Sequence, residues 1–170
     1  MSERSVQHGS FTIERSFKAS PERVFQAWAD GEAKAQWFGA PADQCDEVVR
    51  EMNFRVGGED RLSGKWKASG VTSHFHNHYW DIIPNERIVY TYEMHLDEKK
   101  ISISLATIEF KPSGDGTLMT LTEQGAFLDG FDDNGGREHG TKLLMGNLAQ
   151  FVDGEGKDTE GWRDVHGPKN

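Results

Sequence analysis

The chain has 170 residues, and its 28 Asp and Glu residues outnumber its 19 Lys and Arg residues, which gives a formal net charge of −9 at pH 7. This length fits one domain with a substantial core. An aromatic content of 11% excludes a wholly disordered chain. Nucleic acids and anionic membranes attract clustered Lys and Arg, so we expect no nucleic-acid partner and no stable membrane association.

The single cysteine, Cys45, excludes an intrachain disulfide and a zinc site built from cysteines. The first residues contain no apolar segment of the kind found in secretory signals. No apolar run approaches the roughly 20 residues that span a bilayer. We therefore expect a cytoplasmic protein that is a monomer or a weak homodimer.

The N-terminal quarter predicts one strand and two short helices. Residues 10–18 alternate between apolar and polar side chains, which is typical of a strand. Ser20 then supplies a helix cap and Pro21 the first helical position, so a short helix is expected over residues 21–29. Residues 32–38 predict a second short helix.

Residues 44 to 125 predict a run of strands separated by turns rich in Gly, Pro, Asn and Asp. Consecutive strands joined by short turns indicate an antiparallel meander rather than a parallel sheet. The six predicted strands are 46–56, 59–67, 72–83, 87–96, 100–111 and 117–125.

The C-terminal part predicts a loop and one long helix. Residues 126–135 are rich in Gly and Asp and predict a loop, whose acidic part, residues 129–135, is interpreted as a flexible lid. Residues 136–152 carry an apolar stripe of helical period. Gly140 and Gly146 within this helix each cost roughly 1 kcal/mol of helix propensity. Close packing on the sheet explains these glycines, and so does a gap left for a ligand.

Three segments follow from this pattern: a flexible N-terminus (1–9), one folded domain (10–153) and a polar tail (154–170). Within the tail, Trp162 is the side chain able to dock on the domain.

Several stretches in this order resemble one known family. They are Ser20-Pro21-Glu22-Arg23-Val24-Phe25-Gln26-Ala27-Trp28, Gln36-Trp37-Phe38-Gly39, Phe54-Arg55-Val56-Gly57-Gly58, Ile82-Ile83-Pro84-Asn85-Glu86-Arg87-Ile88-Val89-Tyr90-Thr91 and Gly116-Thr117-Leu118-Met119-Thr120-Leu121-Thr122-Glu123. Together they resemble the START/SRPBCC superfamily, in the branch named after the activator of heat-shock-protein-90 ATPase. The resemblance covers residues 10–153.

The resemblance implies an α+β helix-grip fold of the START type. In this fold a curved antiparallel sheet wraps around a long C-terminal helix, and two short helices lie between the first two strands. Members of the superfamily bind lipids, hormones or polyketides, some cyclise or sequester natural products, and one branch activates a chaperone. This chain departs from its relatives after the double glycine, where it has Glu59-Asp60 in place of apolar side chains.

A sheet curled around a helix leaves a space that is either filled by the core or open as a pocket. The strand positions facing this space are rich in Met, which adapts to irregular ligands, and in Tyr, which adds a hydroxyl group. Ordinary core packing explains these residues as well as pocket lining does. The candidate ligand-binding residues are Met52, Phe54, Trp80, Ile88, Tyr90, Tyr92, Met94, Met119, Leu121, Glu123, Phe127, His139, Leu143, Leu144 and Asn147.

Glu123 shares the predicted inward face of its strand with apolar residues. A carboxyl group there needs a hydrogen-bond partner or a raised pKa. Tyr92 and His139 are the candidate partners, and the three residues are also the candidates for acid/base catalysis. The alternative is a structural hydrogen bond at the rim of the pocket.

Histidines at positions 74, 76 and 78 alternate along one strand and therefore share a face. His76 and His78, like His74 and His76, have a spacing that allows two ligands to one metal ion, but the sequence does not supply a third ligand. A polar role in the pocket or on the surface is therefore preferred, and no metal is predicted. Gly57-Gly58 lacks the lysine of a phosphate-binding loop, so no cofactor is expected either.

Three functions are consistent with this sequence. The preferred one is binding of a small hydrophobic or amphipathic molecule, in sequestration or stress response. The second is a cofactor-free cyclase, dehydratase or hydrolase that acts on an aromatic or polyketide-like substrate. The third is partnership with a chaperone whose ATPase the protein activates.

Overall fold

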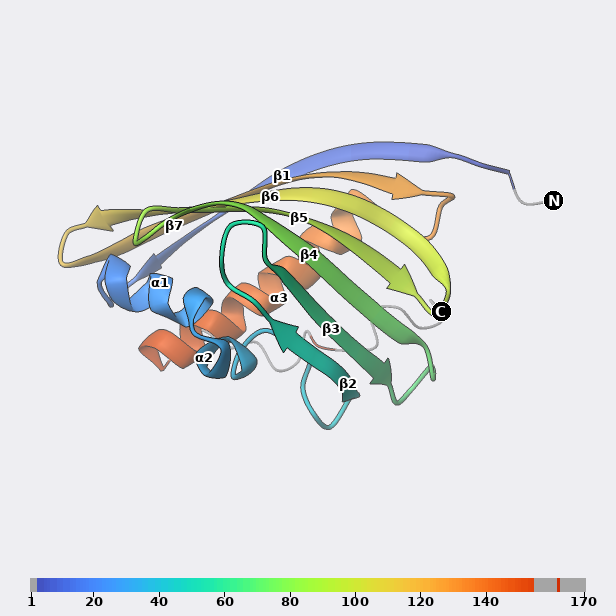
Figure 1. Ribbon diagram of the computed structural model, residues 1–170, viewed down its shortest axis with the longest axis horizontal. Helices are drawn as coiled ribbons and strands as arrows, with labels where there is room; N and C mark the ends of the chain where they lie inside the picture. Colours follow the sequence, from blue (N-terminus) through green and yellow to red (C-terminus); the bar gives the residue numbers. More distant parts are fainter. Residues whose placement is uncertain (1–2, 155–161, 163–170) are drawn as a thin grey trace.

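The computed structural model describes residues 3–154 and Trp162. These residues form seven strands and three helices (Figure 1). In chain order the elements are β1 (Val6–Phe17), α1 (Pro21–Ala29), α2 (Gly31–Ala35), β2 (Cys45–Met52), β3 (Glu59–Trp66), β4 (Thr72–Ile83), β5 (Arg87–Leu96), β6 (Lys99–Ser113), β7 (Gly116–Leu128) and α3 (Asn134–Asp153).

The strands form one antiparallel sheet in the order β1-β7-β6-β5-β4-β3-β2. Strands β2 to β7 are the predicted meander, and β1 pairs with β7 along its whole length. The sheet curves around α3, and α1 and α2 lie on the same side of it (Figure 1). This arrangement confirms the predicted α+β helix-grip fold. None of the described helices is long and apolar enough to cross a membrane.

The helix α1 begins where its local chemistry predicts. The Ser20 Oγ accepts a hydrogen bond of 3.3 Å from the backbone N–H of Arg23, and Pro21 occupies the first turn. Helix α2 is shorter than the predicted 32–38 and ends at Ala35. Trp37 lies in the turn after α2, and its indole N–H donates a 2.9 Å hydrogen bond to the Ala27 carbonyl of α1. This bond and the contact with the Trp28 ring hold the turn against α1, so the helix does not continue.

The long helix α3 is capped at both ends. The Asp133 carboxylate accepts a hydrogen bond of 2.7 Å from the N–H of Gly136, and Gly154 ends the helix with a φ of 77°. The helix therefore extends slightly beyond the predicted 136–152.

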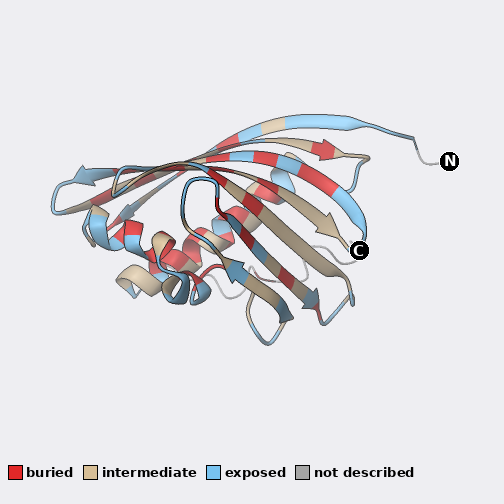
Figure 2. Cartoon of the chain, viewed as in Figure 1, coloured by how far each residue is buried: buried red, intermediate tan, exposed pale blue. Residues whose placement is uncertain are grey.

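The main core lies where α1 and the C-terminal half of α3 cover the sheet, as the buried residues in Figure 2 show. The Phe25 ring contacts Phe110 and Phe54 edge to face, at centroid distances of 5.6 and 5.8 Å. A second cluster joins Trp66, Leu143 and Trp162. Trp162 is buried, so this residue of the predicted tail docks on the domain; the rest of the tail, apart from Gly154, lies outside the described residues.

Three predicted boundaries are corrected, two of them by strand pairing. β1 starts at Val6, which pairs with Leu128, so residues 6–9 belong to the sheet rather than to a flexible N-terminus. The same pairing extends β7 into the predicted loop at 126–135. β2 ends at Met52, earlier than the predicted 56, because a turn follows in which Gly57 has a φ of 84°.

A β-bulge in β4 places Trp80 on the outer face of the sheet. Tyr79 pairs with Tyr90 and Asp81 pairs with Val89, so Trp80 is an extra residue without an opposite partner. Trp80 is 61% exposed, and its indole N–H donates a 2.7 Å hydrogen bond to Thr91. The prediction that Trp80 contacts a ligand inside the sheet is therefore corrected.

Candidate functional site

A cavity of about 370 Å³ lies between the concave face of the sheet and α3. Its walls come from strands β2 to β5 and β7, from helices α1 and α3, from the segments that follow α2 and precede α3, and from Trp162. Most of the wall is apolar, and Leu62, Trp66, Phe75, Met94 and Leu144 contribute to it. The volume lies in the range of about 300–1,000 Å³ that is typical of small-molecule sites.

Six of the predicted ligand-binding residues line this cavity. Three of them alternate along β5, one lies on β7 and two lie on α3. These residues are Tyr90, Tyr92, Met94, Leu121, His139 and Leu144.

The remaining candidates lie elsewhere, each for an identifiable reason. Ile88 and Met119 are fully buried in the main core, and the Phe54 ring packs between Phe25 and Tyr79. Met52 lines a small separate recess of about 20 Å³ beside β2.

The α3 candidates Leu143 and Asn147 do not line the cavity either. Leu143 is buried in the cluster with Trp66 and Trp162 and is not itself part of the cavity wall. Asn147 donates hydrogen bonds of 3.1 and 3.2 Å to the carbonyls of Trp37 and Gly39, so it fastens the segment after α2 to α3.

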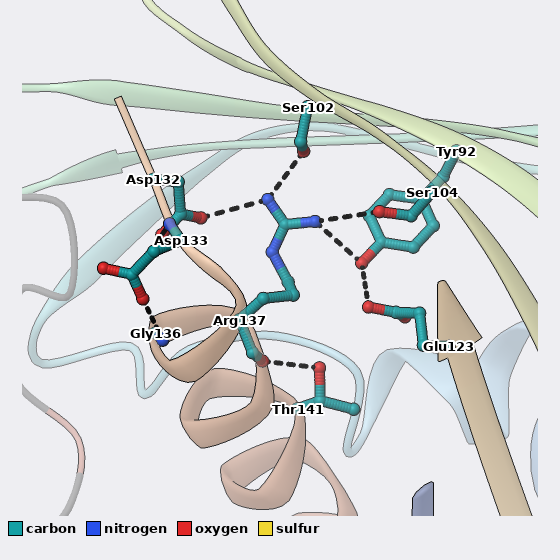
Figure 3. A network of polar contacts seen from close by, with 9 residues as sticks. All are labelled: Tyr92, Ser102, Ser104, Glu123, Asp132, Asp133, Gly136, Arg137 and Thr141. Carbon is teal, nitrogen blue, oxygen red and sulfur yellow. Dashed lines mark hydrogen bonds and ion pairs between the residues drawn. The ribbon is translucent and has the colours of Figure 1, made fainter. Parts of the chain in front are cut away.

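One end of the cavity is polar because Arg137 enters it from the first turn of α3 (Figure 3). The guanidinium donates hydrogen bonds of 2.7 Å to Ser102, 3.3 Å to Ser104 and 2.9 Å to Tyr92. It also forms an ion pair of 3.1 Å with Asp132. This buried side chain thus joins the helix to strands β5 and β6.

The same guanidinium lies over two aromatic rings. Its carbon is 5.4 Å from the ring centres of Tyr92 and of Phe127. Phe127 is therefore buried beneath Arg137 and supports the polar end without lining the cavity.

Glu123 lies behind Tyr92 and is not part of the cavity wall. The Tyr92 hydroxyl donates a 2.9 Å hydrogen bond to the carboxyl group, as Figure 3 shows. Burial raises the pKa of Glu123 to about 7, although the charge of Arg137 and the hydrogen bond from Tyr92 both favour the ionised form. Burial likewise raises the pKa of the Tyr92 hydroxyl. A ligand in the cavity would thus meet Tyr92 and not Glu123.

His139 does not join this polar cluster. Within residues 3–154 and Trp162, no hydrogen bond links it to Glu123 or Tyr92. It is an exposed part of the wall, as is Glu47 on β2, so both residues mark places where the cavity reaches solvent.

Gly140 is where the helix leaves room for the cavity. A Cβ atom built there meets no atom within 4 Å, and the residue lines the cavity. The surroundings of Gly140 are therefore consistent with the interpretation that this glycine leaves a gap for a ligand. Gly146 is buried and does not line the cavity, which fits close packing.

Arg137 and Asp132 were missed by reasoning from the sequence. The available signal was helical spacing, because Arg137, Thr141 and Leu148 recur on the buried side of α3. An arginine on an apolar stripe requires buried acceptors, and the hydroxyl groups of Ser102 and Ser104 on β6 supply them.

A second buried ionic cluster lies under α2. The Lys34 ammonium is 3.0 Å from the Asp60 carboxylate, and the Tyr79 hydroxyl donates a hydrogen bond to the same carboxylate. Burial lowers the pKa of Lys34 against the opposing effect of Asp60. The unusual acid at position 60 is thus paired inside the core, and it does not line the 370 Å³ cavity.

The histidines at positions 74, 76 and 78 face outward. Between them, Phe75 lines the cavity and Asn77 is fully buried. Of the two polar roles that the sequence allows, in the pocket or on the surface, the pocket is therefore excluded for these three histidines, which do not line the cavity.

Comparison with known proteins assigns this chain to a family. The family described as activator of Hsp90 ATPase homolog 1-like protein matches residues 18–153. No curated protein matches the chain.

Two solved structures share both sequence and fold with this chain. A protein from Rhizobium leguminosarum is 42% identical with a TM-score of 0.84, and the match covers 90% of this chain and 99% of that one. The Mll3558 protein from Rhizobium loti is 41% identical with a TM-score of 0.79, over 87% of this chain and 99% of that one.

A third solved structure, the AHSA1-like protein from Aeromonas hydrophila, shares the fold at 17% identity and a TM-score of 0.65, over 86% of this chain and 93% of that one. The family match spans most of the folded domain, and the two rhizobial structures agree with it along nearly their whole length. The chain therefore belongs to the family of activator of Hsp90 ATPase homolog 1-like proteins.

Proposed function

We propose that this protein binds a small amphipathic molecule in the cavity between the sheet and α3. The observation that carries the proposal is an apolar cavity of about 370 Å³ with one polar end, formed by Tyr92 and Arg137. Apolar contact contributes about 25 cal/mol per Å² of buried surface before ordering costs are subtracted. The polar end then fixes the orientation of the ligand.

The charge of the polar end favours a neutral head group. Asp132 already neutralises Arg137, and Glu123 is largely protonated below its pKa of about 7. The cluster thus carries no surplus positive charge that would compensate for a buried carboxylate on the ligand. A hydroxyl, carbonyl or amide group fits this end better.

Two measurements test the proposal. Native mass spectrometry of freshly purified protein is expected to show a co-purified small molecule. NMR titration with a naphthol and with the matching naphthoate is expected to shift amide signals around the cavity, with tighter binding of the naphthol.

Gly140 offers a matched pair of variants. Gly140→Phe places a ring where no atom lies within 4 Å of a Cβ, so it fills the cavity and weakens naphthol binding by about tenfold or more. Gly140→Ala leaves most of the volume open and serves as the control. Equal affinity in both variants, or no binding by the wild-type chain, contradicts the proposal.

Acid/base catalysis is a second candidate, because Glu123 has a pKa near neutrality. The geometry favours binding, since Glu123 reaches the cavity only through Tyr92 and burial makes the Tyr92 hydroxyl harder to ionise. Glu123→Gln separates the two functions, because Glu123 does not line the cavity. It removes the titrating carboxyl group and leaves the cavity wall unchanged, so naphthol binding is kept while turnover of any substrate is lost if the protein is an enzyme.

Activation of a chaperone is the activity from which the matching family takes its name. We leave it as an alternative to be tested by co-purification with the endogenous chaperone, because no contact among residues 3–154 favours it over ligand binding.

A further inference from the structure

Three metal-ligand side chains meet on the outer face of the sheet, opposite the cavity. Glu59 lies on β3, and His76 and His78 lie on β4. Glu59 pairs directly with His78 in the strand register, and His76 follows two residues away on the same face. The third ligand that the sequence did not reveal is thus supplied by the neighbouring strand.

The spacing of these groups matches a tetrahedral zinc site. The Nε2 atom of His76 is 3.5 Å from one carboxylate oxygen of Glu59, and the Nδ1 atom of His78 is 3.1 Å from the other. The ligand atoms of the three residues all lie within 4.8 Å of one another. Metal–ligand bonds of about 2.0–2.2 Å in tetrahedral geometry place two ligands about 3.3 Å apart.

An independent observation also points to a bound ion. The Nε2 atom of His76 is shielded from solvent, yet it has no hydrogen-bond partner among the described residues. Shielded polar atoms without a partner are uncommon in folded proteins and call for an explanation. A metal ion between His76 and Glu59 would satisfy this nitrogen.

We propose that Glu59, His76 and His78 bind a divalent transition metal, with Zn²⁺ the best match. Two imidazoles and one carboxylate suit zinc, whereas calcium and magnesium prefer oxygen ligands alone. The Glu59 side chain is 43% exposed and that of His78 is 39% exposed, so water completes the coordination. The site does not depend on the cavity or on its ligand.

Arg61 is the competing cation. Its guanidinium is 3.8 Å from the Glu59 carboxylate, and both side chains are about half exposed. Exposed ion pairs of this kind contribute little, so zinc displaces the arginine from Glu59 at small cost. The bound ion would link β3 to β4 and stabilise the folded state.

The test uses the full chain after chelator treatment and dialysis. Zinc affinity is measured by competition with a chromogenic chelator, and the site is located by NMR shifts of the amides of residues 59, 76 and 78. We expect zinc to raise the melting temperature and to bind at low micromolar or tighter concentrations. His76→Ala, His78→Ala and Glu59→Gln are each expected to weaken binding by about tenfold or more.

His8→Ala is the matched control, because His8 is exposed on β1 and far from this cluster in the sheet order. It is expected to leave zinc affinity unchanged. Melting curves of the metal-free variants establish that each one folds. Unchanged zinc affinity in the His76→Ala/His78→Ala double variant, or no binding by the wild-type chain, overturns the proposal.

Discussion

Arg137 on α3 donates a 2.9 Å hydrogen bond to the hydroxyl of Tyr92 on β5, and this contact ties the long helix to the sheet at the polar end of the cavity. The same hydroxyl donates to Glu123. The groups that are available to a ligand's head therefore also determine where the helix rests. Binding at this end and the stability of the domain are coupled for that reason.

The Glu123→Gln variant is expected to flatten the dependence of stability on pH. The pKa of Glu123 is about 7 in the folded state against 4.5 for an ordinary glutamate side chain, so the folded protein holds a proton that the unfolded chain releases. The free energy of unfolding then falls as pH rises from about 4.5 to about 7, by about 3 kcal/mol at most. Urea unfolding at several pH values measures this slope.

Glu14→Gln is the control for this experiment, because Glu14 is exposed on β1. It is expected to keep the slope of the wild-type chain. An identical slope in Glu123→Gln and the wild type would mean that Glu123 ionises in the folded state as it does in water.

Arg137→Met is expected to move the pKa of Glu123 above 7. The guanidinium is the nearest positive charge, and its removal leaves burial unopposed except by the Tyr92 hydrogen bond. NMR titration of the side-chain carboxyl carbon measures the shift. A lower pKa in this variant would contradict the arrangement described.

The same variant is expected to unfold more easily, by about 3–5 kcal/mol, because Asp132 loses its partner and two buried serines lose a donor. Chemical unfolding at neutral pH measures this loss.

Replacement of Lys34 by Met is expected to cost about 3–5 kcal/mol of stability, since it leaves the buried Asp60 carboxylate without a cation and with only the Tyr79 hydroxyl and the Asn53 N–H as donors. The Lys34→Met/Asp60→Leu double variant removes both charges and is expected to lose less. Chemical unfolding of the two variants gives the comparison. A double variant that is less stable than Lys34→Met would contradict this expectation, because it would show that the Asp60 carboxylate stabilises the fold even without Lys34.

Gly140→Ala is expected to stabilise the protein by about 1 kcal/mol, because it improves helix propensity and meets no neighbouring atom. Gly58→Ala is the contrasting variant. A Cβ atom at position 58 would lie 2.1 Å from the Asn53 carbonyl oxygen, so a loss of stability is expected there. Thermal unfolding of both variants checks the two directions.

Much of the fold could be predicted because local chemistry specifies it. Ser20 and Pro21 define the start of α1, and turn residues separate the strands of the meander. The alternation of apolar side chains also placed Tyr90, Tyr92 and Met94 on the inner face of β5.

The polar end of the cavity could not be predicted in the same way. Arg137 meets Ser102, Ser104 and Tyr92 across 33 to 45 residues of sequence, and no local pattern encodes such a contact. Glu59 beside His78 likewise depends on the register between two strands. The face of Trp80 was mistaken because a bulge breaks the simple alternation.

That bulge has a consequence for how this sequence can change in length. Trp80 is the residue of β4 left over between the Tyr79–Tyr90 and Asp81–Val89 pairs. Deleting it alone would leave a continuous ladder in which Tyr79 and Ile82 still point into the core. A deletion inside a strand ordinarily turns one of its halves inside out, but at this position the chain can lose a residue and keep its interior.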